Sequence, residues 1–150
     1  FNMWSLYVLG GMLEPVLGRG RFAALYAMSL FGGSLAVLWL TSADTPVIGA
    51  SGAVFGLMGA LFVISKNLGG NTNQLLIVIA LNLFMGFVVS NIAWQAHVGG
   101  LLVGALIGWI YSSNRRVEQQ KRRQLLLAAL AVALVVGAVL GAQWMLAVNG

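Results

Sequence analysis

The chain has no cysteine and very few charged side chains. Of its 150 residues 7% are charged, with 8 Lys and Arg against 3 Asp and Glu, whereas 60% are hydrophobic and the mean hydropathy is +0.94. The absence of cysteine excludes disulfides, thiolate zinc sites and thiol nucleophiles. A soluble domain carries about 25% charged residues, because its surface faces water. The scarcity of charge therefore excludes a water-soluble globule and indicates that lipid surrounds most of this chain.

Six apolar segments account for most of the sequence. A membrane-spanning helix needs roughly 20 apolar residues, and backbone groups in lipid must be hydrogen-bonded within the segment. The segments are 1–13, 22–40, 48–65, 75–92, 96–111 and 125–148. We therefore predict an all-α fold, a polytopic helical membrane protein. The chain begins without methionine or a basic leader, so we expect it to be a fragment of a longer protein.

The basic residues mark one side of the membrane. If the segments cross alternately, the connections after the first, third and fifth lie on one face, and they hold all eight basic residues: Arg19, Arg21, Lys66, Arg115, Arg116, Lys121, Arg122 and Arg123. The opposite connections, 41–46 and 90–95, hold none. Basic loops are typical of the cytoplasmic side. The net charge of +5 thus indicates topology rather than nucleic-acid binding, although a basic run can also contact anionic lipid.

This orientation places three polar side chains at similar depth on the non-cytoplasmic side: Asn2, Ser51 and His97, the only histidine. Glycines recur every three or four residues in the segments that carry the last two, namely Gly52, Gly56 and Gly59, then Gly100, Gly104 and Gly108. Such stripes let two helix backbones approach closely in lipid. If the stripes face each other, Ser51 and His97 meet at the outer ends of a tightly packed helix pair.

These residue types can perform acyl transfer together. A serine hydroxyl becomes a nucleophile when a neighbouring neutral imidazole accepts its proton. A helix start and an asparagine amide can stabilise an oxyanion. No acid is placed to complete a triad, because Glu14 and Glu118 lie on the other face and Asp44 in a loop, which leaves a dyad. Taken singly, the serine is also compatible with a bond to its own helix, the histidine with a proton relay and the asparagine with a helix cap.

Three motifs in order resemble the rhomboid family of intramembrane serine proteases. The first is Phe1-Asn2-Met3 followed by Gly10-Gly11 and Glu14, the second is Gly49-Ala50-Ser51-Gly52, and the third runs from Ala96-His97 to Gly104. The resemblance covers residues 1–112 and implies helices 2 to 6 of a six-helix protease core. A basic cytoplasmic linker, 113–123, and an additional C-terminal transmembrane helix, 124–150, would follow it.

The resemblance also implies residue roles. Ser51 matches the nucleophile, His97 the general base, and Asn2 with Ala50 the groups that stabilise the oxyanion or substrate. Phe55 stands where some members have a tyrosine stacked on the catalytic histidine. Supporting positions are Gly49, Gly52, Gly100 and Gly104. The implied activity is cleavage of peptide bonds in or beside transmembrane segments of membrane proteins, with no metal or organic cofactor.

Two further expectations concern location and alternatives. The segment from 49 to 65 spans about 25 Å as a helix, less than the roughly 30 Å of hydrocarbon, so Ser51 should lie recessed in a cavity that opens outward. We expect a bacterial cell membrane, with the site facing the non-cytoplasmic side. A catalytically inactive relative that binds transmembrane segments stays open as an alternative, and so does a transporter, because polar clusters at membrane depth also mark solute paths.

Overall fold

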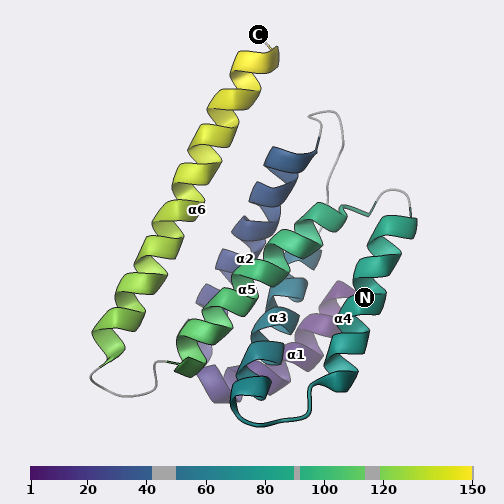
Figure 1. Ribbon diagram of the computed structural model, residues 1–150, viewed down its shortest axis with the longest axis vertical. Helices are drawn as coiled ribbons and strands as arrows, with labels where there is room; N and C mark the ends of the chain where they lie inside the picture. Colours follow the sequence, from purple (N-terminus) through teal and green to yellow (C-terminus); the bar gives the residue numbers. More distant parts are fainter. Residues whose placement is uncertain (42–49, 90–91, 114–118, 150) are drawn as a thin grey trace.

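The described part of the chain consists entirely of helices. The computed structural model describes all residues except 42–49, 90–91, 114–118 and 150 (Figure 1). Within the described ranges six helices and no strands occur: α1 (Asn2–Leu17), α2 (Arg19–Leu40), α3 (Ser51–Asn67), α4 (Asn73–Val88), α5 (Trp94–Ser113) and α6 (Gln120–Asn149). The predicted all-α fold is confirmed.

Several of these helices have the length and composition of membrane spans. In the described residues, three are long and apolar enough to cross a bilayer: Arg19–Leu40, Trp94–Ser113 and, within α6, Arg122–Ala147. Helices α3 and α4 are apolar but shorter. Away from the helix ends, backbone groups bond along the helix, as a lipid environment requires. The chain is therefore an integral helical membrane protein.

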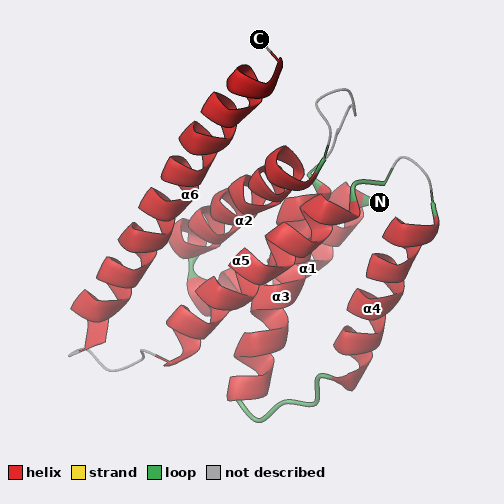
Figure 2. Ribbon diagram, turned by 45° about the horizontal axis from the view of Figure 1, so that its top comes forward, coloured by secondary structure: helices red, strands yellow, loops and turns green. Residues whose placement is uncertain are grey.

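Helix α3 forms the centre of the bundle. It packs against α1, α2, α4 and α5, whereas α6 packs against α2 and α5 only. Figure 2 shows α6 and α4 at opposite sides of this arrangement. The stretch from Gly52 to Leu61 is buried throughout, because four neighbouring helices surround α3.

At the centre of the fold, helices α3 and α5 contact each other directly through their backbones, with no side chains between them. A Cβ atom added to Gly100 would overlap the backbone of Gly52, and one added to Gly104 would overlap that of Gly56. Further along, a Cβ at Gly108 would lie 2.8 Å from the Cα of Ala60. The two glycine stripes therefore face each other as predicted.

A third helix joins this close contact, which the sequence patterns did not predict. A Cβ on Gly33 of α2 would lie 2.9 Å from the carbonyl oxygen of Ala96 and 3.2 Å from the Cα of Gly52. Its neighbour Gly32 would meet Val103 and the Gly99 carbonyl. The first turns of α3 and α5 therefore pack closely against the second half of α2.

The prediction that residues 14–21 connect the first two apolar segments as a loop is wrong. Helix α1 continues to Leu17 and α2 begins at Arg19, so Gly18 alone joins them, with φ of 79°. Glycine adopts this left-handed conformation without a steric penalty, which lets the chain reverse within one residue. The polar residues end the helices instead of forming a loop, and Arg19 lies 3.3 Å from Glu14 in an exposed ion pair.

Helix α6 contacts α2 near the C-terminal end of α2. The indole N–H of Trp39 donates a hydrogen bond of 3.2 Å to the carbonyl of Gly137, and its ring stacks on Trp144 at 6.1 Å. Helix α6 begins at Gln120, five residues before the apolar segment 125–148 and four before the expected helix 124–150, because its basic first turn continues the helix. The central part of the expected linker, 114–118, lies outside the described residues.

The glycine contact predicts opposite effects of one substitution at two sites. Gly104→Ala should lower the free energy of unfolding by about 1–3 kcal/mol, because the added methyl meets backbone that cannot move aside. Gly11→Ala is the matched control, since its Cβ would meet nothing within 4 Å, and alanine stabilises a helix by up to about 1 kcal/mol relative to glycine. Denaturant unfolding in detergent micelles measures both, and equal effects at the two sites would contradict the contact.

Candidate active site

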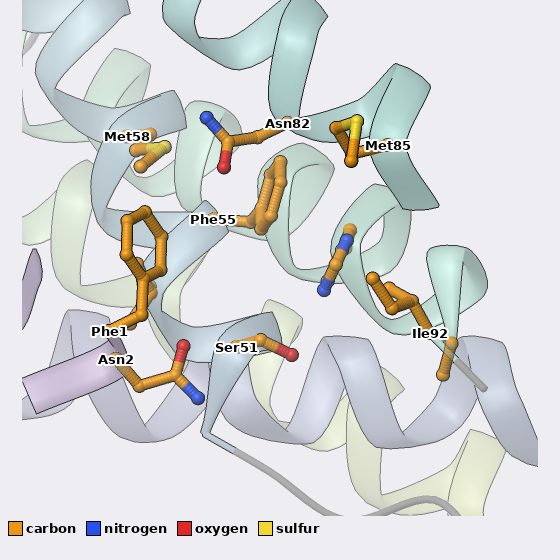
Figure 3. A pocket seen from close by; sticks show the side chains of 11 residues that line it. Phe1, Asn2, Ser51, Phe55, Met58, Asn82, Met85 and Ile92 are labelled. Carbon is orange, nitrogen blue, oxygen red and sulfur yellow. The ribbon is translucent and has the colours of Figure 1, made fainter. Parts of the chain in front are cut away.

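A single cavity brings the three predicted polar side chains together. Its volume is about 260 Å³, and Asn2, Ser51 and His97 all line it (Figure 3). The remaining lining is mainly apolar and comes from α1, α3, α4 and the segment that leads into α5: Phe1, Val54, Phe55, Met58, Asn82, Met85, Ile92 and Ala93. Residues far apart in the sequence thus form one polar site within an apolar wall.

Ser51 is the first residue of α3, with Ala50 directly before it as the half-buried cap. The first turn closes with the bond from the Val54 N–H to the Ala50 carbonyl, 3.1 Å long. The amides of Ser51, Gly52 and Ala53 therefore have no partner within the helix, and no side chain caps them. Such a helix start is favourable for negative charge. The hydroxyl of Ser51 thus lies beside a group of backbone donors.

His97 is held against the ring of Phe55. Its side chain is only 7% exposed. The two rings are stacked, with centroids 4.1 Å apart and planes 14° from parallel, as expected for an aromatic ring at position 55. Helix α3 therefore supplies both the serine and the surface on which the imidazole lies flat.

The two nitrogens of the imidazole have different surroundings. Nδ1 is buried without a hydrogen-bond partner among the described residues, and it faces α4, where a Cβ added to Gly86 would lie 3.4 Å away. Nε2 is thus the nitrogen available to a group in the cavity. Within the described side chains no hydrogen bond joins Ser51 to His97, and such bonds commonly tighten only when a substrate is bound.

Asn2, the first residue of α1, forms another side of the cavity. It is half-buried, and Figure 3 shows its amide on the side of the cavity nearest Ser51. Of the supporting positions, Gly52, Gly100 and Gly104 make the helix contacts described above, whereas Gly49 lies outside the described residues. The described part of the chain holds no group of three or more His, Asp or Glu that could bind a metal ion.

Sequence reasoning missed the contribution of α4, which lines the cavity with Asn82 and Met85. One signal could have found the first of these. Asn82 is the one polar residue in the stretch 75–88 of α4, and polar residues within an apolar membrane segment usually have a functional reason. Met85 carries no such signal, because one apolar side chain in a helix that is apolar all round does not reveal which way it faces.

Comparison with known proteins decides the family. A family model for the Rhomboid domain matches residues 1–114. The chain belongs to the rhomboid family. This membership supports an intramembrane protease type of function for the fold described above.

Rhomboid relatives come from bacteria, fungi and plants. The chain is 34% identical over 145 residues to Rhomboid protease GluP of Bacillus subtilis, covering 91% of this chain and 27% of that protein. It is 35% identical over 141 residues to Rhomboid protein 1, mitochondrial, of Saccharomyces cerevisiae, covering 83% and 40%. RHOMBOID-like protein 5 of Arabidopsis thaliana is 38% identical over 117 residues, covering 73% and 38%. No solved structure matches the chain.

These relatives are much longer than the chain, which spans 27% to 40% of their length. The rhomboid match ends at residue 114, between α5 and α6. The division into a core over 1–112, a linker and an additional transmembrane helix stays a prediction, as do the roles of the individual site residues.

The stack on the histidine predicts a measurable coupling. In a double-mutant cycle, Phe55→Leu and His97→Leu should show an interaction energy of about 0.5–1.5 kcal/mol in unfolding experiments, the range for paired aromatic rings. Phe55→Leu with Trp39→Leu is the control, because Trp39 stacks on Trp144 instead and the effects should add. A coupling near zero for the first pair would show that the two rings do not hold each other.

Proposed function

We propose that this chain is the catalytic core of an intramembrane serine endopeptidase. Its substrates are membrane proteins, cleaved in or beside a transmembrane segment. The observation that carries the proposal is the cavity in which Ser51, His97 and Asn2 meet at the start of a buried helix. The rhomboid membership of the chain supports the same reading.

The proposed reaction proceeds through an acyl-enzyme. Nε2 of His97 accepts the proton of the Ser51 hydroxyl while Oγ attacks the carbonyl carbon of the scissile bond. The negative oxygen of the tetrahedral intermediate is stabilised by the amides at the start of α3 and the side-chain amide of Asn2. His97 then gives its proton to the leaving amine as the C–N bond breaks. A water molecule, deprotonated by the same imidazole, hydrolyses the ester and restores Ser51.

Hydrolysis inside a membrane needs water at the serine. Helix α3 has 17 residues and is therefore about 25 Å long, shorter than the roughly 30 Å of hydrocarbon. One end of the helix thus lies below the membrane surface. The cavity of about 260 Å³ is far larger than the roughly 10–15 Å³ that a single water requires. In the proposed arrangement Ser51 therefore lies below the membrane surface and is reached by water through the cavity.

The proposed orientation places the cavity on the non-cytoplasmic side. Arg19 and Arg21 lie at the start of α2 and Lys66 at the end of α3, at the opposite end of α3 from Ser51. Basic residues favour the cytoplasm. A bacterial cell membrane stays a prediction, because the relatives include a mitochondrial protein and plant proteins.

The catalytic proposal is tested with a fluorophosphonate probe and a single-span membrane substrate, on the full-length chain in detergent. Ser51→Ala and His97→Ala should each abolish probe labelling and substrate cleavage, because the nucleophile or its base is removed. Ser34→Ala, an exposed serine on α2, is the matched control and should retain both.

Two outcomes would overturn the assignment. Undiminished labelling in Ser51→Ala would show that another residue is the nucleophile. Wild-type protein that binds transmembrane segments but neither labels nor cleaves would favour the inactive relative.

The orientation has a separate test that uses the absence of native cysteine. Asn71→Cys, in the exposed connection between α3 and α4, should react with a membrane-impermeant maleimide only from the cytoplasmic side. Val89→Cys, directly after α4 at its other end, should react only from the opposite side. The reverse pattern would place the cavity toward the cytoplasm.

A further inference from the structure

Asn82 is a polar side chain that neither the fold nor the proposed reaction explains. It lies in the second half of α4 (Asn73–Val88), half-buried, and it lines the cavity. Figure 3 shows it with Phe55 and Met58 on the upper part of the cavity, above Ser51. A polar side chain in a lipid-embedded helix is costly, so its retention calls for a reason.

Packing between helices does not supply that reason. The side-chain hydrogen bond of Asn82 stays inside its own helix: Nδ2 donates to the carbonyl of Val78, four residues earlier, at 2.8 Å. Asparagine commonly joins neighbouring membrane helices by bonding across to them. Among the described residues the amide of Asn82 bonds to no other helix, and a leucine would fill the same position at lower cost.

The bond to Val78 fixes the orientation of the amide, because one N–H of Nδ2 is used in it and Oδ1 is turned away from that carbonyl. A carbonyl accepts only from a donor, so the nitrogen must face Val78 and the oxygen cannot take its place. Among the described residues none donates a hydrogen bond to Oδ1, which is therefore an acceptor open to a group in the cavity. Its near neighbours in the cavity wall are the apolar side chains of Phe55, Met58 and Met85, which offer no donor.

We propose that Asn82 is a specificity-determining residue of the protease. Its amide oxygen accepts a hydrogen bond from a hydroxyl on a substrate side chain, that of serine or threonine, beside the scissile bond. This inference rests on the proposed endopeptidase function.

Discrimination against apolar side chains follows from the same geometry. A substrate with valine in place of threonine has nearly the same shape but strips water from Oδ1 without replacing the hydrogen bond. An acceptor left unpaired in an apolar surrounding costs more than the bond itself contributes. Sites built to bond a hydroxyl reject the analogue that lacks it far more strongly than an apolar pocket can separate two hydrocarbons.

The test compares pairs of single-span substrates that differ only by threonine or valine at one residue near the scissile bond, on the full-length chain. At one of the positions flanking the bond, wild type should cleave the threonine substrate with about 10-fold higher kcat/KM. Asn82→Leu and Asn82→Ala should bring this ratio to about 1, because neither variant leaves an acceptor unpaired against the valine substrate. The alanine variant guards against an effect of added bulk.

A double variant provides the matched control. Leu81→Asn combined with Asn82→Leu moves the amide by one residue, to a position that is 59% exposed on the outside of α4. The polarity of the helix is kept, but the acceptor leaves the cavity, so the ratio should again be about 1. Recovery of the threonine preference in this variant would overturn the proposal.

The remaining outcomes separate this inference from the function on which it rests. If cleavage depends on Ser51 but wild type and Asn82→Leu show the same ratio, the specificity role is wrong and the protease function stands. An equal loss on both substrates would assign Asn82 to the substrate backbone or to structure and would also overturn it. Cleavage that survives Ser51→Ala would overturn the function itself.

Discussion

The backbones of α3 and α5 touch at paired glycines, Gly52 with Gly100 and Gly56 with Gly104. In lipid the hydrophobic effect does not hold helices together, so close van der Waals packing must do so. This contact also sets the register of the two helices. Ser51 directly precedes the first glycine of one stripe and His97 lies three residues before the first glycine of the other. The paired glycines, which have no side chains, therefore set the relative positions of Ser51 and His97.

Other features depend on that contact. Because α3 is surrounded by its neighbours, its first residue, Ser51, lines a cavity within the bundle. Phe55, one turn further along α3, lies flat against His97, so the helix that carries the serine also orients the imidazole. Gly33 of α2 meets both helix starts. In the proposed dyad, packing against Phe55 rather than a hydrogen-bonded acid orients the imidazole.

Much of this was accessible from the sequence. Hydropathy predicted the helices, the glycine spacing predicted the facing stripes, and the distribution of basic residues placed Ser51 and His97 at one depth. The tight reversal at Gly18 could not be predicted from the sequence, because Glu14 and Arg19 look like a polar loop until their ion pair is seen. The rotation of α4 about its own axis could not be predicted either. A helix that is apolar on every face gives no periodic signal, so the orientation of Asn82 depends on contacts between helices that lie far apart in the sequence.

The central claim is that the glycine contact between α3 and α5 sets the geometry of the site. Its most direct test is the rate constant for fluorophosphonate labelling of Ser51 in Gly104→Ala, compared with Gly11→Ala on preparations of equal helix content. Gly104 lies two turns from His97 and does not line the cavity. The account predicts at least a roughly 10-fold slower rate, since a small displacement of a reacting group can cost about 10²-fold. Labelling at the wild-type rate in folded Gly104→Ala would contradict it.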